Sequence, residues 1–149
     1  MYKNIVIPID LSEKYSWKSV VPRVLSLVTA FGSKLHLVHV IPDYGLQMVE
    51  DYLPSNWFND QIKKSKDHIN ALIAKYIPEE VDVITHICKG AVYDEVIQYS
   101  AKVDADLIVV SAVRPEQKYY MLGPNASKIV RHAETSVLVI RDQVGYNGK

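Results

Sequence analysis

The sequence predicts an α/β protein with a single doubly wound, five-stranded parallel sheet of strand order 3-2-1-4-5 and helices on both faces. Two observations support this prediction. Continuous apolar runs alternate along the chain with segments whose apolar residues recur at helical spacing. The apolar runs also lack the alternating polarity of half-exposed strands, as expected for strands covered on both faces. Such alternation implies right-handed crossovers and a parallel sheet.

The first expected strand is the run "NIVIPI" at 4–9. The helix after it is expected to have Ser12 as its N-cap and to stop at Gly32, with a kink caused by Pro22. The later strands are expected at 34–41, 81–90, 106–111 and 136–141, and the later helices at 60–77, 91–103 and 125–134. The chain of 149 residues suits one domain, which we place at 1–142, and a flexible tail is expected at 143–149.

Residues 42–59 have no clear periodicity and stay unassigned. Their aromatic side chains could form a lid over a site, a partner surface, or a cover for the sheet edge. These aromatic residues are Tyr44, Tyr52, Trp57 and Phe58. Tyr119 and Tyr120 leave the same alternatives open, because they fall in the loop expected near the mouth of any cavity.

The composition excludes several classes of partner. The 17 basic residues balance the 17 acidic residues, so the chain has no electrostatic signature of a nucleic-acid or membrane-surface protein. No apolar stretch approaches the roughly 20 residues of a membrane span, and we expect a soluble, cytoplasmic protein. The single cysteine, Cys88, is expected to be a small core residue, and the histidines show no metal-ligand spacing.

The position of a ligand site follows from the predicted winding. In an open parallel sheet, ligands bind beyond the carboxyl ends of the strands, where the winding direction reverses. For order 3-2-1-4-5 this point lies between the first and fourth strands. The residues that follow Ile9 and Val110 are therefore the candidates.

Four stretches of the chain resemble the universal stress protein family. They are "IVIPIDLSE", "HLVHVIP", "KGAVYDEVIQYSAKVDADLIVVS" and "LGPNASKIVRHAETSVLVIR", and together they extend over almost the whole chain. The last stretch is the most specific. It is similar to the branch of the family with an arginine-proline loop and an "LLGSNA" motif, which here are "RP" at 114–115 and "MLGPNA" at 121–126.

The resemblance implies a dimeric α/β protein that, in many members, binds ATP or another adenine nucleotide in a regulatory role. Carried over to this sequence, Asp10 would accept hydrogen bonds from the base or its neighbours, and Val40 would meet the base edge through its backbone. The implied ligand-binding residues are Pro8, Ile9, Asp10, Val40, Val110, Ser111, Arg114, Gly123, Pro124, Asn125 and Ala126. Those from Arg114 onward would surround the phosphates.

General physical chemistry supports the phosphate end of this set. The first N–H groups of a helix carry a partial positive charge and have no helical partner, so they stabilise an anion. Gly123 would let the backbone approach closely and adopt angles that other residues avoid. Arg114 would add forked donors that suit phosphate. Two simpler roles stay open: Asp10 as a cap of the first helix and Arg114 as a solvated loop charge.

The sequence departs from the family's phosphate-binding pattern of glycine, two residues, glycine, nine residues, glycine and serine or threonine. Ser111 and Arg114 replace the first two glycines, and the loop before Gly123 is one residue shorter. Pro124 replaces the serine. Proline suits the first helical position, but it lacks the hydroxyl and the N–H that would face a phosphate. Arg114 or Lys118 could compensate.

Three functions therefore compete. The first is a nucleotide-binding regulatory protein in the stress response. The second is a dimeric stress or scaffold protein that has lost nucleotide binding and acts through protein contacts. The third is an enzyme, at most a slow ATPase, for which no catalytic set, metal cluster or P-loop lysine assembles.

The expected assembly is a homodimer. The strand "SVLVIR", Ser136 to Arg141, is apolar and lies at an edge of the predicted sheet. Exposed apolar edges favour pairing. The family resemblance implies that the last strands pair antiparallel across a two-fold axis.

Overall fold

The computed structural model of the chain describes residues 1–12, 15–42, 52–112 and 122–141. It contains a five-stranded sheet with order β3-β2-β1-β4-β5, and every pair of neighbouring strands is parallel. The strands are β1 (Asn4–Pro8), β2 (Lys34–Pro42), β3 (Val83–Gly90), β4 (Leu107–Ser111) and β5 (Ser136–Ile140). The predicted fold class and strand order are confirmed.

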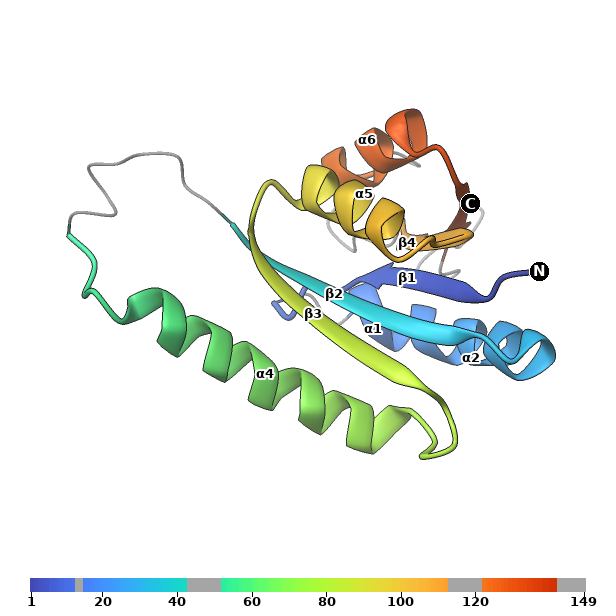
Figure 1. The fold of residues 1–149 in the computed structure, drawn as a ribbon, viewed down its shortest axis with the longest axis horizontal. Coiled ribbons are helices and arrows are strands. Elements are labelled where there is room, and N and C mark those ends of the chain that lie inside the picture. The colour runs from blue at the N-terminus through green and yellow to red at the C-terminus, as the bar shows by residue number, and fades with distance from the viewer. Residues whose placement is uncertain (13–14, 43–51, 113–121, 142–149) are drawn as a thin grey trace, which may run out of the picture.

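Helices cover both faces of the sheet (Figure 1). The helices are α1 (Tyr15–Lys18), α2 (Val20–Phe31), α4 (Trp57–Tyr76), α5 (Val92–Lys102) and α6 (Pro124–His132). The first three lie on one face of the sheet, and α5 and α6 lie on the other.

The two cores follow from the alternation of side chains along the strands. On β1, Ile5 and Ile7 face the core shared with α1, α2 and α4, whereas Val6 faces the core shared with α5 and α6. All three side chains are fully buried. The central strands have apolar residues on both faces because both faces are covered, which explains the continuous apolar runs.

The segment between β1 and β2 contains the irregularity expected from Pro22. The expected single helix is divided in two, since α1 ends at Lys18 and α2 begins at Val20. Proline has no N–H to donate to the carbonyl four residues earlier, so the helix is interrupted one turn before Pro22. Because α1 begins at Tyr15, Ser12 does not cap it directly. Gly32 ends α2 as expected, in the left-handed region at φ 63°.

The helix α4 begins earlier than the apolar pattern predicts. Trp57 and Phe58 belong to its first turn rather than to an unassigned segment. Trp57 N–H donates to Pro54 O at 2.9 Å, and the ammonium of Lys89 lies 5.7 Å from the ring centre of Phe58. The Tyr52 side chain is 86% exposed, whereas Tyr44 lies outside the described residues.

Candidate functional site

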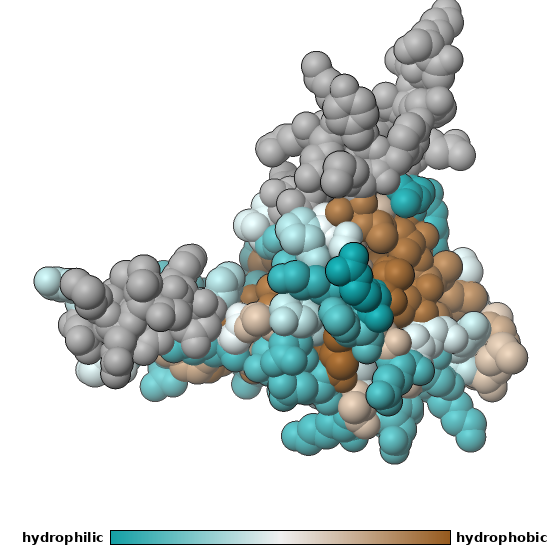
Figure 2. Space-filling model, turned by 90° about the horizontal axis from the view of Figure 1, so that it is seen from above, coloured by the Kyte–Doolittle hydropathy of each residue, from teal (hydrophilic) through white to brown (hydrophobic). Residues whose placement is uncertain are grey.

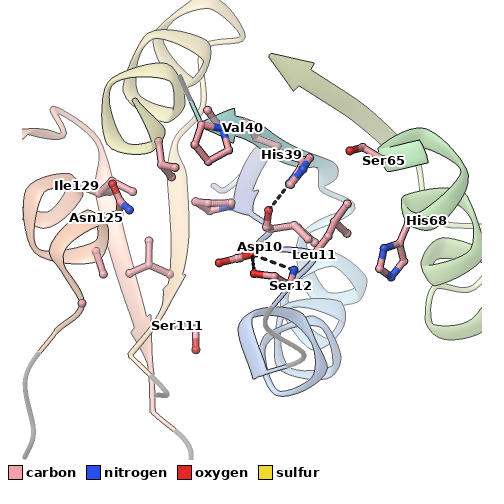
Figure 3. Close-up of a pocket in the computed structure, with 18 of the residues that line it drawn as sticks. Asp10, Leu11, Ser12, His39, Val40, Ser65, His68, Ser111, Asn125 and Ile129 are labelled. Carbon is pink, nitrogen blue, oxygen red and sulfur yellow. Dashed lines mark hydrogen bonds between the residues drawn. The ribbon is translucent and has the colours of Figure 1, made fainter. Parts of the chain in front are cut away.

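A cavity of about 630 Å³ opens at the carboxyl ends of β1, β2 and β4. Its size falls within the range of roughly 300–1,000 Å³ that is usual for small-molecule sites. This is the place where the winding of the sheet changes direction, as predicted for a ligand site. Figure 3 shows the cavity between α6, carrying Asn125 and Ile129, and α4, carrying Ser65 and His68.

The structure brings most of the predicted ligand-binding residues together at this cavity. Those that line it are Pro8, Ile9, Asp10, Val40, Val110, Ser111, Gly123, Asn125 and Ala126. Pro124, the first residue of α6, is exposed to solvent and is not among the residues that line the cavity. Arg114 lies outside the described residues, as do Lys118, Tyr119 and Tyr120.

The chain turns sharply where it leaves β1. The Asp10 Oδ1 atom accepts hydrogen bonds from the Ser12 backbone N–H at 3.0 Å and from the Ser12 hydroxyl at 2.6 Å. A carboxylate that accepts from the residue two positions later forms an Asx turn, which holds the chain locally. Asp10 therefore has a structural role at the start of the helical segment and also lines the cavity.

A hydrogen bond joins the ends of β1 and β2. The His39 Nδ1–H donates to the carbonyl oxygen of Ile9 at 3.0 Å, and the N–H of Ile9 donates to the Val38 carbonyl at 2.7 Å. Because a carbonyl only accepts, Nδ1 is the protonated nitrogen in neutral His39. His39 also lines the cavity, a position that the sequence analysis did not predict.

The α6 side of the cavity begins at Gly123. This residue has φ −60° and ψ 162°, an ordinary conformation for any residue, so the expectation of special backbone angles is wrong. Its carbonyl accepts the first helical hydrogen bond, from Ser127 N–H at 2.9 Å. The backbone of α6 thus starts beside the cavity, with Asn125 and Ala126 in its lining. Pro124 has no N–H to offer there.

The first half of α4 supplies a side of the cavity that the sequence analysis missed. Gln61, Lys64, Ser65 and His68 line it, and their spacing puts them on one face of the helix. The apolar periodicity of this segment marks the core-facing row, which runs from the buried Ser65 to Ile69 and Leu72 further along the helix. A polar row on a helix is usually solvated surface, so the only available signal was the position of this helix directly after the second strand.

The remaining histidines and the cysteine lie away from the cavity or pack in the core. His36 is 2% exposed, with Nδ1 2.9 Å from the Tyr99 hydroxyl and Nε2 3.1 Å from Asn4 Oδ1, as expected for a satisfied core histidine. Burial, followed by the neighbouring charge of Glu95, raises the pKa of the half-buried Cys88 thiol to about 11. A thiol that stays protonated at neutral pH is a poor nucleophile, so a packing role fits Cys88.

Within the described ranges, no group of three or more histidine, cysteine, aspartate or glutamate side chains is arranged to hold a metal ion. In the same ranges, no helix has the length and apolar character needed to cross a membrane.

The fold and the cavity define a doubly wound α/β protein with a cavity at the switch point of its sheet. The model of the universal stress protein family matches residues 1–141. The chain therefore belongs to the universal stress protein family. Universal stress protein G of Salmonella typhimurium is 28% identical over 144 residues, which cover 95% of this chain and 100% of that protein.

Solved structures share this fold. Universal stress protein UspA from Lactobacillus plantarum superposes with a TM-score of 0.73 at 21% identity, covering 94% of this chain and 98% of the other. The universal stress protein from Archaeoglobus fulgidus in complex with dAMP gives 0.69 at 18% identity, covering 93% and 98%. A universal stress protein in complex with cAMP gives 0.60 at 22% identity, covering 94% and 97%.

Proposed function

We propose that the protein binds an adenine nucleotide, ATP, ADP or AMP, in the cavity between the ends of β1 and β4 and acts as a regulatory protein in the stress response. The observation that carries this proposal is the cavity itself, which lies at the switch point and has a volume of about 630 Å³. The two relatives in complex with dAMP and cAMP support an adenine ligand.

The lining of the cavity suits the parts of a nucleotide. Apolar side chains, including Val40, Val110 and Ile129, offer a surface for a flat base. Asp10 and Ser111 lie in the same lining and supply polar groups that can orient the base and the ribose. The backbone amides at the start of α6, after Pro124, provide donors for an anion.

Calorimetric titration with ATP, ADP, AMP and adenosine tests this function. We expect measurable heat and a rise in melting temperature, because a ligand that binds only the folded state stabilises it. The variant Ala126→Phe would place a large ring at this lining position and should abolish both signals; because Ala126 is buried, circular dichroism and a melting curve without nucleotide must first verify that the variant folds. Absence of heat and of any thermal shift at millimolar nucleotide would contradict the proposal.

The competing function is that of a stress or scaffold protein that no longer binds nucleotide. Pro124 favours it, because this residue removes two donors from the phosphate side, the serine hydroxyl and one backbone N–H. A nucleotide retained through purification, or micromolar binding in solution, would exclude this second function.

We further propose that the protein is a homodimer that pairs through β5. This strand forms one edge of the sheet, and its Leu138 side chain is 38% exposed. A groove of about 460 Å³ lies against it, lined by Arg23, Leu27, Leu138, Val139, Ile140 and Arg141. Figure 2 shows that hydrophobic surface gathers in one broad area of the face seen there, as is common where proteins associate. Cytoplasmic location stays a prediction from the sequence.

A further inference from the structure

A buried hydroxyl group on α4 lines the cavity without a partner. Ser65 is 8% exposed, and within the described ranges no residue forms a hydrogen bond with its side chain. Figure 3 shows this side chain directed from α4 towards the side on which His39 lies. Leaving a buried polar group without a partner costs free energy. The Ser65 hydroxyl is therefore a group that a ligand in the cavity can satisfy.

His39 supplies a hydrogen-bond acceptor to the same cavity. Its Nδ1–H donates to the Ile9 carbonyl oxygen at 3.0 Å, which fixes both the orientation of the ring and its tautomer. In this tautomer the second ring nitrogen, Nε2, carries no hydrogen and can only accept. The ring is half-buried and lines the cavity, and Nε2 has no partner in the part of the chain that the structure describes. The cavity thus contains an acceptor whose position is fixed by β1 and β2.

These two groups lie where the base of a nucleotide would be, away from its phosphates. The start of α6, with Asn125, lies across the cavity from α4 in Figure 3, and its backbone amides are the proposed anion donors. A nucleotide held by its phosphates at α6 extends its base towards the ends of β1 and β2. Val40, which offers apolar surface to the base, directly follows His39 on β2. Because neighbouring side chains on a strand point to opposite faces, His39 lies on the α4 side of this strand end.

The chemistry of the two groups decides which purine fits. At position 6, adenine has an amino group with two N–H donors, whereas guanine and hypoxanthine have a carbonyl oxygen that only accepts. The Nε2 atom of His39 can accept from the amino group, and the second N–H can donate to another acceptor at the strand ends. Opposite a carbonyl oxygen, two acceptors would face each other and neither would be satisfied. The Ser65 hydroxyl can both donate and accept, so it suits either kind of base.

We propose that His39 and Ser65 bind the edge of the purine base around position 6, and that His39 makes the cavity selective for 6-amino over 6-oxo purines. The inference rests on the proposed function, because it presumes a nucleotide in the cavity with its phosphates at the start of α6. His39 then has two roles. Its Nδ1–H holds the ends of β1 and β2 together, and its Nε2 accepts a hydrogen bond from the base. Ser65 adds affinity without selectivity.

The test is a calorimetric titration of AMP and of inosine monophosphate (IMP), in which an oxygen replaces the amino group, into the 149-residue chain. The titrations are run at pH 8, above the range in which free imidazole titrates. We expect the wild type to bind AMP about tenfold more tightly than IMP, because only the amino group can donate to His39.

The informative variant is His39→Asn. The amide nitrogen of asparagine takes the place of Nδ1, so the hydrogen bond to Ile9 can be kept while the acceptor at Nε2 is lost. We expect this variant to bind AMP about tenfold more weakly and IMP within about twofold of the wild type, so that the preference disappears. Ser65→Ala should weaken both ligands about threefold and keep the preference. The control, His132→Asn, makes the same exchange at an exposed histidine that does not line the cavity, and it should bind like the wild type.

The outcomes separate this inference from the function on which it rests. If the wild type binds neither ligand, nor ATP, the proposed function and the inference both fail. If it binds AMP and IMP equally well, nucleotide binding stands and the selectivity is overturned. A wild-type preference in His39→Asn would show that another group selects the base, which overturns the role of His39. Wild-type affinities in Ser65→Ala would overturn its place in the base site.

Circular dichroism and melting curves without ligand verify that each variant folds. If His39→Asn does not fold, His39→Gln replaces it. The terminal amide of glutamine can turn to accept or to donate, so this second variant should also bind AMP and IMP with equal affinity. A preference for AMP that persists in His39→Gln would contradict the proposal.

Discussion

The Nδ1 atom of His39 lies 3.0 Å from the carbonyl oxygen of Ile9, so a side chain of β2 holds the chain where it leaves β1. Ile9 is 4% exposed, and the two residues are 30 positions apart in the sequence. Both line the cavity. This hydrogen bond therefore fixes the relative position of two strand ends that form the floor of the site.

Replacing His39 by leucine should remove this hydrogen bond without opening a large void. The Ile9 carbonyl would lose its side-chain partner, and we expect a loss of about 1 kcal/mol in the free energy of unfolding. For a chain of this length this corresponds to a fall of about 2–4 °C in melting temperature. Urea unfolding monitored by circular dichroism measures this free energy. A variant as stable as the wild type would show that the hydrogen bond from His39 to Ile9 does not contribute to stability.

Replacing Pro124 by serine should strengthen phosphate binding. The change restores one backbone N–H and one hydroxyl at the start of α6, and hydrogen bonds to charged groups are each worth about 1.5–3 kcal/mol. We expect affinity for AMP to rise by about tenfold or more, whereas affinity for adenosine stays unchanged. Calorimetry with the two ligands makes the comparison. An equal gain for adenosine would point to a change in the base site instead.

The buried His36 predicts a loss of stability in acid. Burial, followed by the nearby charge of Lys34, lowers the pKa of His36 from its usual 6.5. The unfolded chain then binds a proton more readily than the folded chain, so stability rises with pH across this interval. Conversely, the free energy of unfolding should fall as the pH drops below about 6.5. It should continue to fall until the pH is below the pKa that His36 has in the folded state.

Denaturant unfolding between pH 7 and pH 5 tests this dependence, with His36→Gln as the informative variant and His132→Gln as the control. His36→Gln should show a flatter pH profile than the wild type, and His132→Gln, at the exposed end of α6, should not. Burial also lowers the pKa of His86, whose ring centre lies 4.2 Å from that of Tyr99 in a stacked arrangement. Some dependence of stability on pH will therefore persist in His36→Gln. Identical profiles for the wild type and His36→Gln would contradict the assignment.

The proposed dimer depends on the apolar edge of β5. Leu138→Lys would place a charge on this edge, and charged side chains on edge strands oppose pairing. We expect light scattering at micromolar concentration to give the mass of a dimer for the wild type and of a monomer for the variant. A wild-type mass of one chain, 16.9 kDa, would refute the dimer directly.

Much of the fold could be predicted from the sequence because its strands are buried on both faces. Runs such as 107–110 are continuously apolar, and each is followed or preceded by a segment of helical periodicity. Helix ends were harder to place. The start of α4 at Trp57 follows proline, serine and asparagine without a periodic apolar row, and the break before Pro22 depends on a missing hydrogen bond rather than on a composition change.

The site was predictable where it is made by strand ends and the start of α6, because topology alone places those residues together. Asp10 and Val110 are examples, since each follows or ends a buried strand at the switch point. The side of the cavity that α4 supplies was not predictable. Lys64 and His68 line the cavity because Ile69 and Leu72, in the turn that follows His68, pack in the core beneath the sheet, and that packing depends on the angle of the helix in three dimensions.

A crystal structure grown with millimolar AMP tests the central claim most directly. The account predicts electron density for one nucleotide between the carboxyl ends of β1 and β4, with its base against Val40 and Val110. A structure in which this space is filled by the protein's own side chains, or in which AMP is absent while the fold is unchanged, would contradict nucleotide binding at this site.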